Sequence, residues 1–294
     1  PGVEILDVNA SVAPPTPVIQ AVPSAPAAWN IAATGAPNLW ADGVIGNGVT
    51  VAILDTGVQP DHPVIANTFR NLPSDWYDPY AVTTSPTDYL LDGLTHGTAA
   101  ASLILGGSAS GESIGMAPDA QWIAARVFPV NGAATTANIL AAMQWALDPD
   151  GNSTTDDAPD IVNNSWGFES NPNQCLDLGF PAATATLQNA GIHVIYAGGN
   201  SGPDAATSVS PANNSGGFGV GSLDTNLTVS RFSARGPSPC LSSIYTPVGQ
   251  PDVFPEIQAP GENVWVANGL SSPWGFASTS GTSFSVPHVS GALA

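Results

Sequence analysis

The amino-acid sequence predicts an α/β fold of three layers, in which helices flank a largely parallel central sheet. Short apolar runs alternate with helical segments along most of the 294 residues, a pattern typical of parallel strands joined by helices that cross the faces of a sheet. A hydrophobic content of 43% is enough for a large core. The residues of chemical interest follow strands or open helices, where open α/β sheets place their sites.

The strands and helices are expected in a regular order. Apolar runs rich in β-branched residues predict strands over residues 49–54, 122–127, 160–164 and 192–196, and helices are expected over 29–40, 96–106, 138–147 and 180–190. Gly106 ends the second helix, and Thr135 or Thr136 caps the third. Residues 71–93 contain Trp76, Tyr77, Tyr80, Tyr89 and several Asp, and we expect a long surface insertion, near the functional site or simply packed as a loop.

The charge balance excludes some partners. The net charge is −19, because Asp and Glu number 23 whereas Lys and Arg together number four. Nucleic acid is disfavoured as a partner, since neutralising phosphates requires Lys and Arg, and an anionic membrane surface is disfavoured for the same reason. No apolar run reaches ~18 residues, so the sequence predicts no membrane span.

A serine, a histidine and an aspartate stand where nucleophilic catalysis would need them. Ser283 follows a Gly-Thr pair at a predicted helix start, where backbone N–H groups are free and the helix dipole is positive. Serine alone is a weak nucleophile and needs a base and a residue that orients the base. His96 opens an Ala-rich helix and Asp55 ends a buried strand, so these two residues are the candidates.

Other residues compete for these roles or complete them. Ser285 is a rival nucleophile, but its side chain would leave the helix in a different direction from that of Ser283. His62 is close to Asp55 in the chain, and we expect it to be a loop residue. Asn200 follows a predicted strand, and its neutral amide suits a developing oxyanion; the alternative is a turn residue before Ser201.

The motifs resemble those of the subtilisin-like serine proteases, whose catalytic residues follow the order Asp, His, Ser. The matching stretches are Asp55-Thr56-Gly57, His96-Gly97-Thr98, Gly198-Gly199-Asn200 and Gly281-Thr282-Ser283. Within the family, residues 158–167, 232–238 and 255–261 resemble the bacillopeptidase F-like members. The resemblance extends from about residue 29 to the last residue, and it implies the three-layer subtilisin-like fold.

The resemblance implies a secreted serine endopeptidase acting on protein or peptide substrates, with no cofactor for catalysis. Asp55 would orient His96, His96 would activate Ser283, and Asn200 would stabilise the oxyanion. An acid peptidase of the sedolisin type would lack the histidine and the asparagine. The alternative is a catalytically inactive subtilisin-like scaffold that acts as a binding or structural module. The substrate-binding residues implied are Ser165, Trp166, Gly167, Ala197, Gly198 and Gly199, although Trp166 could equally belong to the core.

The N-terminal segment has a separate interpretation. Residues 2–9 alternate like a strand, and residues 13–28 are rich in Pro, Ala and Ser. By resemblance, residues 1–22 would be the tail of an inhibitory propeptide, residues 23–28 a linker, and residues 29–294 a peptidase domain truncated at its C-terminus. We expect a monomer. The alternative is an unrelated flexible tail. Because the chain starts with Pro1 and Ala294 falls within a predicted helix, we expect a fragment at both ends.

An acidic loop and two cysteines are further candidates for a metal site and a disulfide. The acidic loop 148–157 offers oxygen ligands for structural calcium, with Asp148, Asp150, Asn152 and Asp156 as candidates. The loop does not fit the EF-hand pattern, because Pro159 stands where the bidentate Glu would be, and such loops are often simply solvated. Cys175 and Cys240 lie in polar loops and could form one disulfide or stay as two free thiols.

Overall fold

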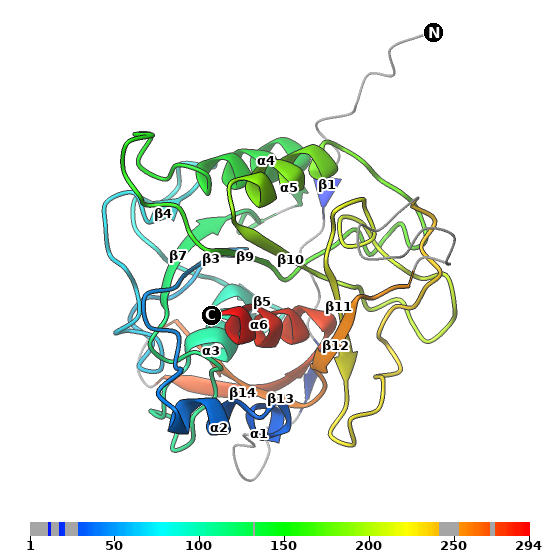
Figure 1. Cartoon of the computed structure of the whole chain (residues 1–294), viewed down its shortest axis with the longest axis horizontal. Coiled ribbons are helices and arrows are strands. Elements are labelled where there is room, and N and C mark those ends of the chain that lie inside the picture. Colours follow the sequence, from blue (N-terminus) through cyan, green and yellow to red (C-terminus); the bar gives the residue numbers. More distant parts are fainter. Residues whose placement is uncertain (1–10, 13–17, 21–28, 132, 241–252, 271–273) are drawn as a thin grey trace, which may run out of the picture.

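A parallel sheet of seven strands runs through the centre of the molecule (Figure 1). The computed structural model describes residues 11–12, 18–20, 29–131, 133–240, 253–270 and 274–294. Every pairing between neighbours in the sheet is parallel. In spatial order the strands are β12 (Ile257–Pro260), β11 (Gly219–Leu223), β10 (His193–Ala197), β9 (Ile161–Asn164), β3 (Thr50–Asp55), β7 (Gln121–Arg126) and β4 (Trp76–Tyr77).

Helices cover both faces of this sheet (Figure 1). On one face lie α4 (Thr136–Trp145) and α5 (Phe180–Asn189), and on the other lie α3 (His96–Leu105) and α6 (Thr282–Leu293). Beyond α3 and α6 are the antiparallel pair β13 (Val264–Asn268) and β14 (Gly275–Ser280), with α1 (Trp29–Thr34) and α2 (Ala36–Ala41). The predicted three-layer α/β fold with a largely parallel sheet is confirmed.

The core lies on both faces of the sheet because strand side chains alternate. In β3, Ala52 and Leu54 join the apolar cluster beneath α4 and α5. Val51 and Ile53 join the cluster beneath α3 and α6. All residues of β3 are buried, which explains why its sequence is a continuous apolar run and not an alternating one.

Most predicted elements are present, with their ends shifted by one or two residues. The strand predicted over residues 2–9 lies outside the described residues. The linker expected at residues 23–28 also lies outside the described residues, whereas β2 (Val18–Gln20), within the expected propeptide tail, pairs with β14. The backbone of β1 (Ser11–Val12) pairs with β8 (Ala134–Thr135). No helix in the described part of the chain is long and apolar enough to cross a membrane.

Candidate active site

Asp55 and His96 are brought together by β3 and α3. Nδ1 of His96 lies 2.7 Å from Oδ1 of Asp55, and both side chains are fully buried. The same oxygen accepts the backbone N–H of Thr56 at 2.7 Å. A carboxylate oxygen only accepts, so Nδ1 carries the proton and Nε2 is the basic nitrogen of the neutral ring. Within the described residues, Nε2 is buried and has no hydrogen-bond partner.

Two glycines allow the turn after β3 to approach the start of α3. A Cβ on Gly97 would collide with the carbonyl oxygen of Gly57. Gly57 has a φ of 121°, a backbone conformation that residues other than glycine rarely adopt. The two Gly residues of the motifs around Asp55 and His96 are therefore explained by close backbone contact.

Ser283 is the second residue of α6, where a backbone N–H has no partner within the helix. The ring of the next residue, Phe284, lies 5.3 Å from the ring of His96, measured between centroids. The start of α6 therefore adjoins the start of α3, which brings Ser283 into the neighbourhood of His96. Pro287 lies in the second turn of α6, and its missing N–H leaves the carbonyl of Ser283 without its usual helical donor.

The Asn200 amide is oriented by the residue before Ser283. Its Oδ1 accepts the backbone N–H of Thr282 at 2.9 Å and the Thr282 hydroxyl at 3.0 Å. Because a backbone N–H can only donate, the amide oxygen is fixed on the Thr282 side and the NH₂ group is the end left for other contacts. Asn200 follows β10, so this contact joins the end of the central sheet to the start of α6.

Glu169 supports the same asparagine and was not identified from the sequence. Its carboxylate accepts the backbone N–H of Asn200 at 2.8 Å and the hydroxyl of Ser201 at 3.0 Å. Burial raises the pKa of Glu169, while these hydrogen bonds oppose the increase. In the sequence, this glutamate cannot be distinguished from a solvated loop residue, because its partners lie about thirty positions away.

The implied substrate-binding residues follow two neighbouring strands. Trp166 is 1% exposed and donates its Nε1–H to the carbonyl of Leu54 at 2.9 Å, so its side chain belongs to the core. Gly167 and Gly199 both lie against Val209: a Cβ on either would approach a methyl of Val209 to within 2.8 Å. The set consists of Ser165, Trp166 and Gly167 after β9, and Ala197, Gly198 and Gly199 at the end of β10.

The two rival residues lie elsewhere. Nε2 of His62 is 3.1 Å from the carbonyl of Gly275, and its ring packs on Trp274 and Phe276. Burial lowers the pKa of His62. Ser285 is fully buried, and its hydroxyl lies against Gly261.

The acidic loop and the cysteines take defined places. One carboxylate oxygen from each of Asp148, Asp150 and Asp157 lies within 4.8 Å of the others. Asp156 does not belong to this group of carboxylates, and the amide oxygen of Asn152 accepts the Thr154 hydroxyl at 2.8 Å. Cys175 and Cys240 are joined by a disulfide, with their Cα atoms 5.2 Å apart.

The fold and the site define an α/β protein in which a hydrogen-bonded aspartate and histidine lie beside the helix that begins with Thr282 and Ser283. Residues 46–294 match the model of the Subtilase family, and the chain belongs to this family. It is 35% identical over 287 residues to bacillopeptidase F of Bacillus subtilis, covering 90% of this chain and 18% of that protein. It is 33% identical over 233 residues to the serine protease AprX of the same organism, covering 74% of this chain and 47% of that protein.

A shorter relative is matched over most of its length. Subtilisin Savinase of Lederbergia lenta is 31% identical over 274 residues, covering 90% of this chain and 82% of that protein. By contrast, the chain spans about a fifth of the length of bacillopeptidase F and under half that of AprX. Residues 46–294, which match the family model, include all four motifs.

Proposed function

We propose that this chain is a serine endopeptidase that hydrolyses peptide bonds through an acyl-enzyme. The observation that carries the proposal is the 2.7 Å hydrogen bond between Asp55 and His96, next to Ser283 at the start of α6. The named proteases among its relatives support the same activity. No observation on the described residues favours the alternative of an inactive scaffold.

The catalytic steps follow from the chemistry of these groups. Asp55 holds the Nδ1–H of His96, so Nε2 takes the proton of the Ser283 hydroxyl as its Oγ attacks the substrate carbonyl. His96 then gives this proton to the leaving amine, and water releases the acyl group by the reverse sequence. The Ser283 N–H and the Asn200 amide stabilise the oxyanion in between. Amino-acid side chains and backbone suffice for each step, so no cofactor is required.

We assign substrate binding to the backbone that follows β9 and β10. A peptide would lie along residues 165–167 as an added strand, so that main-chain hydrogen bonds provide affinity and adjacent side chains provide selectivity. Residues 197–199 would form the other side. The burial of Trp166 supports a role for its backbone at this position and not for its indole ring.

We propose that residues 1–22 act as an inhibitory propeptide tail, followed by a linker at 23–28 and the peptidase domain at 29–294. The antiparallel pairing of Ser11–Val12 with β8 supports a tail that lies on the domain as a strand.

The disulfide between Cys175 and Cys240 supports secretion, because disulfides persist in oxidising compartments. We further propose a monomer; sedimentation of the purified chain at twice its monomer mass would contradict this.

We propose that structural calcium, if the domain holds it in the acidic loop, binds Asp148, Asp150 and Asp157. Carboxylate oxygens are the ligands that Ca²⁺ prefers, and the three carboxylates converge. Oδ1 of Asp148 is buried and has no hydrogen-bond partner among the described residues, which supports its role as a ligand of the cation. The set differs from the predicted one because Asp157, not Asp156, turns toward Asp150.

The test of the proposed activity is labelling with a fluorophosphonate probe, which reacts with activated serines. We expect the wild-type chain to be labelled once residues 1–28 have been removed. We expect Ser283→Ala, treated in the same way, to lose labelling entirely. Ser285→Ala is the matched control and should be labelled like the wild type. A folded wild-type sample that resists the probe would overturn the peptidase proposal and leave the scaffold alternative.

A further inference from the structure

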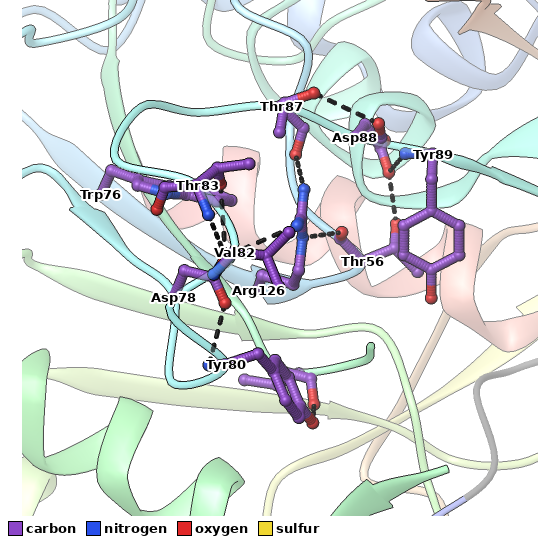
Figure 2. A network of polar contacts seen from close by, with 11 residues as sticks. Thr56, Trp76, Asp78, Tyr80, Val82, Thr83, Thr87, Asp88, Tyr89 and Arg126 are labelled. Atoms are coloured by element: carbon purple, nitrogen blue, oxygen red, sulfur yellow. Dashed lines mark hydrogen bonds and ion pairs between the residues drawn. The ribbon is translucent and has the colours of Figure 1, made fainter. Parts of the chain in front are cut away.

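Asp88 is a buried carboxylate close to the Asp55 and His96 pair that no proposed catalytic step uses. It is 5% exposed and lies in the segment that the sequence predicted as a surface insertion. Its Oδ1 accepts the hydroxyl of Thr56 at 2.7 Å and the backbone N–H of Tyr89 at 2.8 Å. Its Oδ2 accepts the backbone N–H of Thr98 at 2.9 Å and the Thr98 hydroxyl at 2.6 Å. Figure 2 shows Asp88 between Thr56 and Tyr89.

These contacts join the two motifs that carry Asp55 and His96. Thr56 follows Asp55, and its hydroxyl oxygen also accepts the backbone N–H of Gly97 at 3.0 Å. Gly97 and Thr98 are the second and third residues of α3, whose first-turn N–H groups need partners from outside the helix. The N-cap residue of α3, Thr95, makes no side-chain cap. Thr56 and Asp88 supply the missing acceptors, so the start of α3 is capped by residues that are fixed to the turn after Asp55.

A buried arginine holds the segment that carries Asp88. Arg126 donates from Nε to the carbonyl of Thr56 at 3.3 Å and from Nη2 to the carbonyl of Thr87 at 3.0 Å. Its guanidinium also pairs with Asp78 at 3.5 Å and lies 5.5 Å from the centre of the Trp76 ring. In Figure 2, Arg126 stands between these groups and Thr56. Thr56 is therefore held from its carbonyl side by Arg126 and from its hydroxyl side by Asp88.

The ionisation of Asp88 matters for this arrangement. Burial raises the pKa of Asp88 to about 6, and the hydrogen bonds from Thr98, Thr56 and Tyr89 oppose the increase. The ionisable groups nearby are the Tyr89 phenol and, interacting with that phenol, Asp55 and Arg126. At neutral and alkaline pH the carboxylate is ionised and can accept all four hydrogen bonds. An amide at this position has an NH₂ group in place of one oxygen and cannot accept on that side.

We propose that Asp88 is a positioning residue: it clamps the turn after Asp55 to the first turn of α3, so that the Asp55–His96 hydrogen bond is formed before substrate binds. The inference rests on the proposed peptidase function. A misplacement of reacting groups by about 1 Å can cost on the order of 100-fold in rate. Loosening this clamp should therefore reduce turnover without removing any group that touches substrate.

The test compares Asp88→Asn with the wild type, each produced as the full chain and then freed of residues 1–28, using hydrolysis of an alanine-rich peptide nitroanilide. We expect kcat to fall by about 10- to 100-fold while KM stays within a factor of about three, because the loss affects the transition state and not substrate binding. Thr56→Val, which removes the bridging hydroxyl, should reproduce the loss. Thr56→Ser, which keeps the hydroxyl, should retain most of the wild-type kcat.

The matched control is Asp75→Asn. Asp75 is also a fully buried carboxylate that accepts from a backbone N–H and an arginine, but its partners are Leu72 and Arg70. We expect Asp75→Asn to lower the melting temperature while leaving kcat near the wild-type value. Equal losses of kcat in the Asp75 and Asp88 variants, at equal loss of melting temperature, would reduce Asp88 to a structural residue and overturn the inference.

A spectroscopic measurement separates this inference from the proposed function. The Nδ1 proton of His96 in its short hydrogen bond to Asp55 gives a low-field ¹H NMR signal that does not depend on turnover. We expect the signal in the wild type and its shift or broadening in Asp88→Asn. An unlabelled wild type in the fluorophosphonate assay would reject the peptidase, whereas an unchanged low-field signal in Asp88→Asn would reject the clamp.

Discussion

At the scale of single residues, the site depends on side chains whose polar atoms have fixed partners. The Asn200 amide is oriented through its oxygen by Thr282, and its backbone N–H is bound by Glu169. The Asp55 carboxylate is likewise bound by Thr56 as well as by His96. Such fixed partners reduce the reorganisation that a reaction would need, which is the physical basis of electrostatic preorganisation.

Val209 is the residue we expect to limit the size of the substrate side chain before the cut. It is fully buried and packs directly against Gly167 and Gly199, the glycines assigned to the two sides of the peptide. We expect Val209→Ala to raise kcat/KM for a larger residue at that position, relative to alanine, by roughly 10-fold, since one or two methyl groups in an apolar pocket are worth about 1–3 kcal/mol.

The measurement is kcat/KM for a pair of peptide nitroanilides that differ only in that residue, alanine or leucine. Val209→Ile is the opposite variant and should shift the ratio toward alanine. If all three proteins give the same ratio, Val209 does not contact the substrate side chain and the assignment of Gly167 and Gly199 must be revised.

At the scale of elements, two separate contacts hold α6 in place. Its first turn carries Ser283 and is fastened to Asn200, while His288, further along, fastens it to α1. Nδ1 of His288 donates to the carbonyl of Phe284 at 2.8 Å, and Nε2 accepts from the Asn30 amide at 2.9 Å. With one nitrogen donating and the other accepting, the ring is neutral.

This contact predicts a loss of stability in acid. Burial lowers the pKa of His288 to about 4, from about 6.5 when unfolded. Between these values the unfolded chain binds a proton that the folded chain excludes, so the stabilisation is complete above about pH 6.5 and lost as the pH falls toward 4. The difference of about 2.5 pKa units corresponds to about 3 kcal/mol.

Urea unfolding of the wild type and His288→Gln at about pH 7.5 and about pH 4.5 measures this term. We expect the wild type to exceed the variant in free energy of unfolding at the higher pH, and the gap to close by about 2–3 kcal/mol at the lower pH. His193→Gln, at an exposed position of β10, is the control and should show no such change. A gap that is the same at both pH values would show that His288 is not buried in its neutral form.

At the scale of the whole molecule, loops far apart in the chain are tied to the central sheet. The disulfide joins cysteines separated by 65 positions, and the acidic loop 148–157 connects α4 to β9 on the side of the sheet away from α6. The net charge of −19 means that acidic groups outnumber basic partners. Clustered carboxylates such as Asp148, Asp150 and Asp157 therefore gain from a bound cation.

Removal of calcium is expected to destabilise the domain. A ligand that binds only the folded state at about 100 times its dissociation constant adds about 2.7 kcal/mol. Thermal unfolding in excess calcium and in excess chelator should therefore differ for the wild type and coincide for Asp148→Asn. Asp224→Asn changes a single carboxylate in the loop after β11 and should retain the difference. Equal melting temperatures of the wild type in both conditions would contradict calcium binding at this loop.

The sequence by itself determined the fold class and indicated the residues that we propose for the centre of the site. Asp55, His96, Asn200 and Ser283 each lie in a short motif beside a recognisable strand or helix, and these features depend on residues a few positions apart. The continuous apolar run that became β3 is a local signal of the same kind. Such short-range patterns can be recognised in a sequence because helices and strands repeat with fixed periods.

Only the tertiary structure decided which residues surround that centre. Asp88 reaches Thr56 across 32 positions and Glu169 reaches Asn200 across 31, and no local pattern marks either as buried. Residues 71–93 were predicted as a long surface insertion, near the functional site or packed as a loop, and within them Asp88 is buried with four donors around it. The contacts of Val209 with the two glycines and of Asp157 with Asp150 were likewise identified only from the tertiary structure. A buried carboxylate is stable only where donors from distant segments converge, and that convergence is a property of the packed chain.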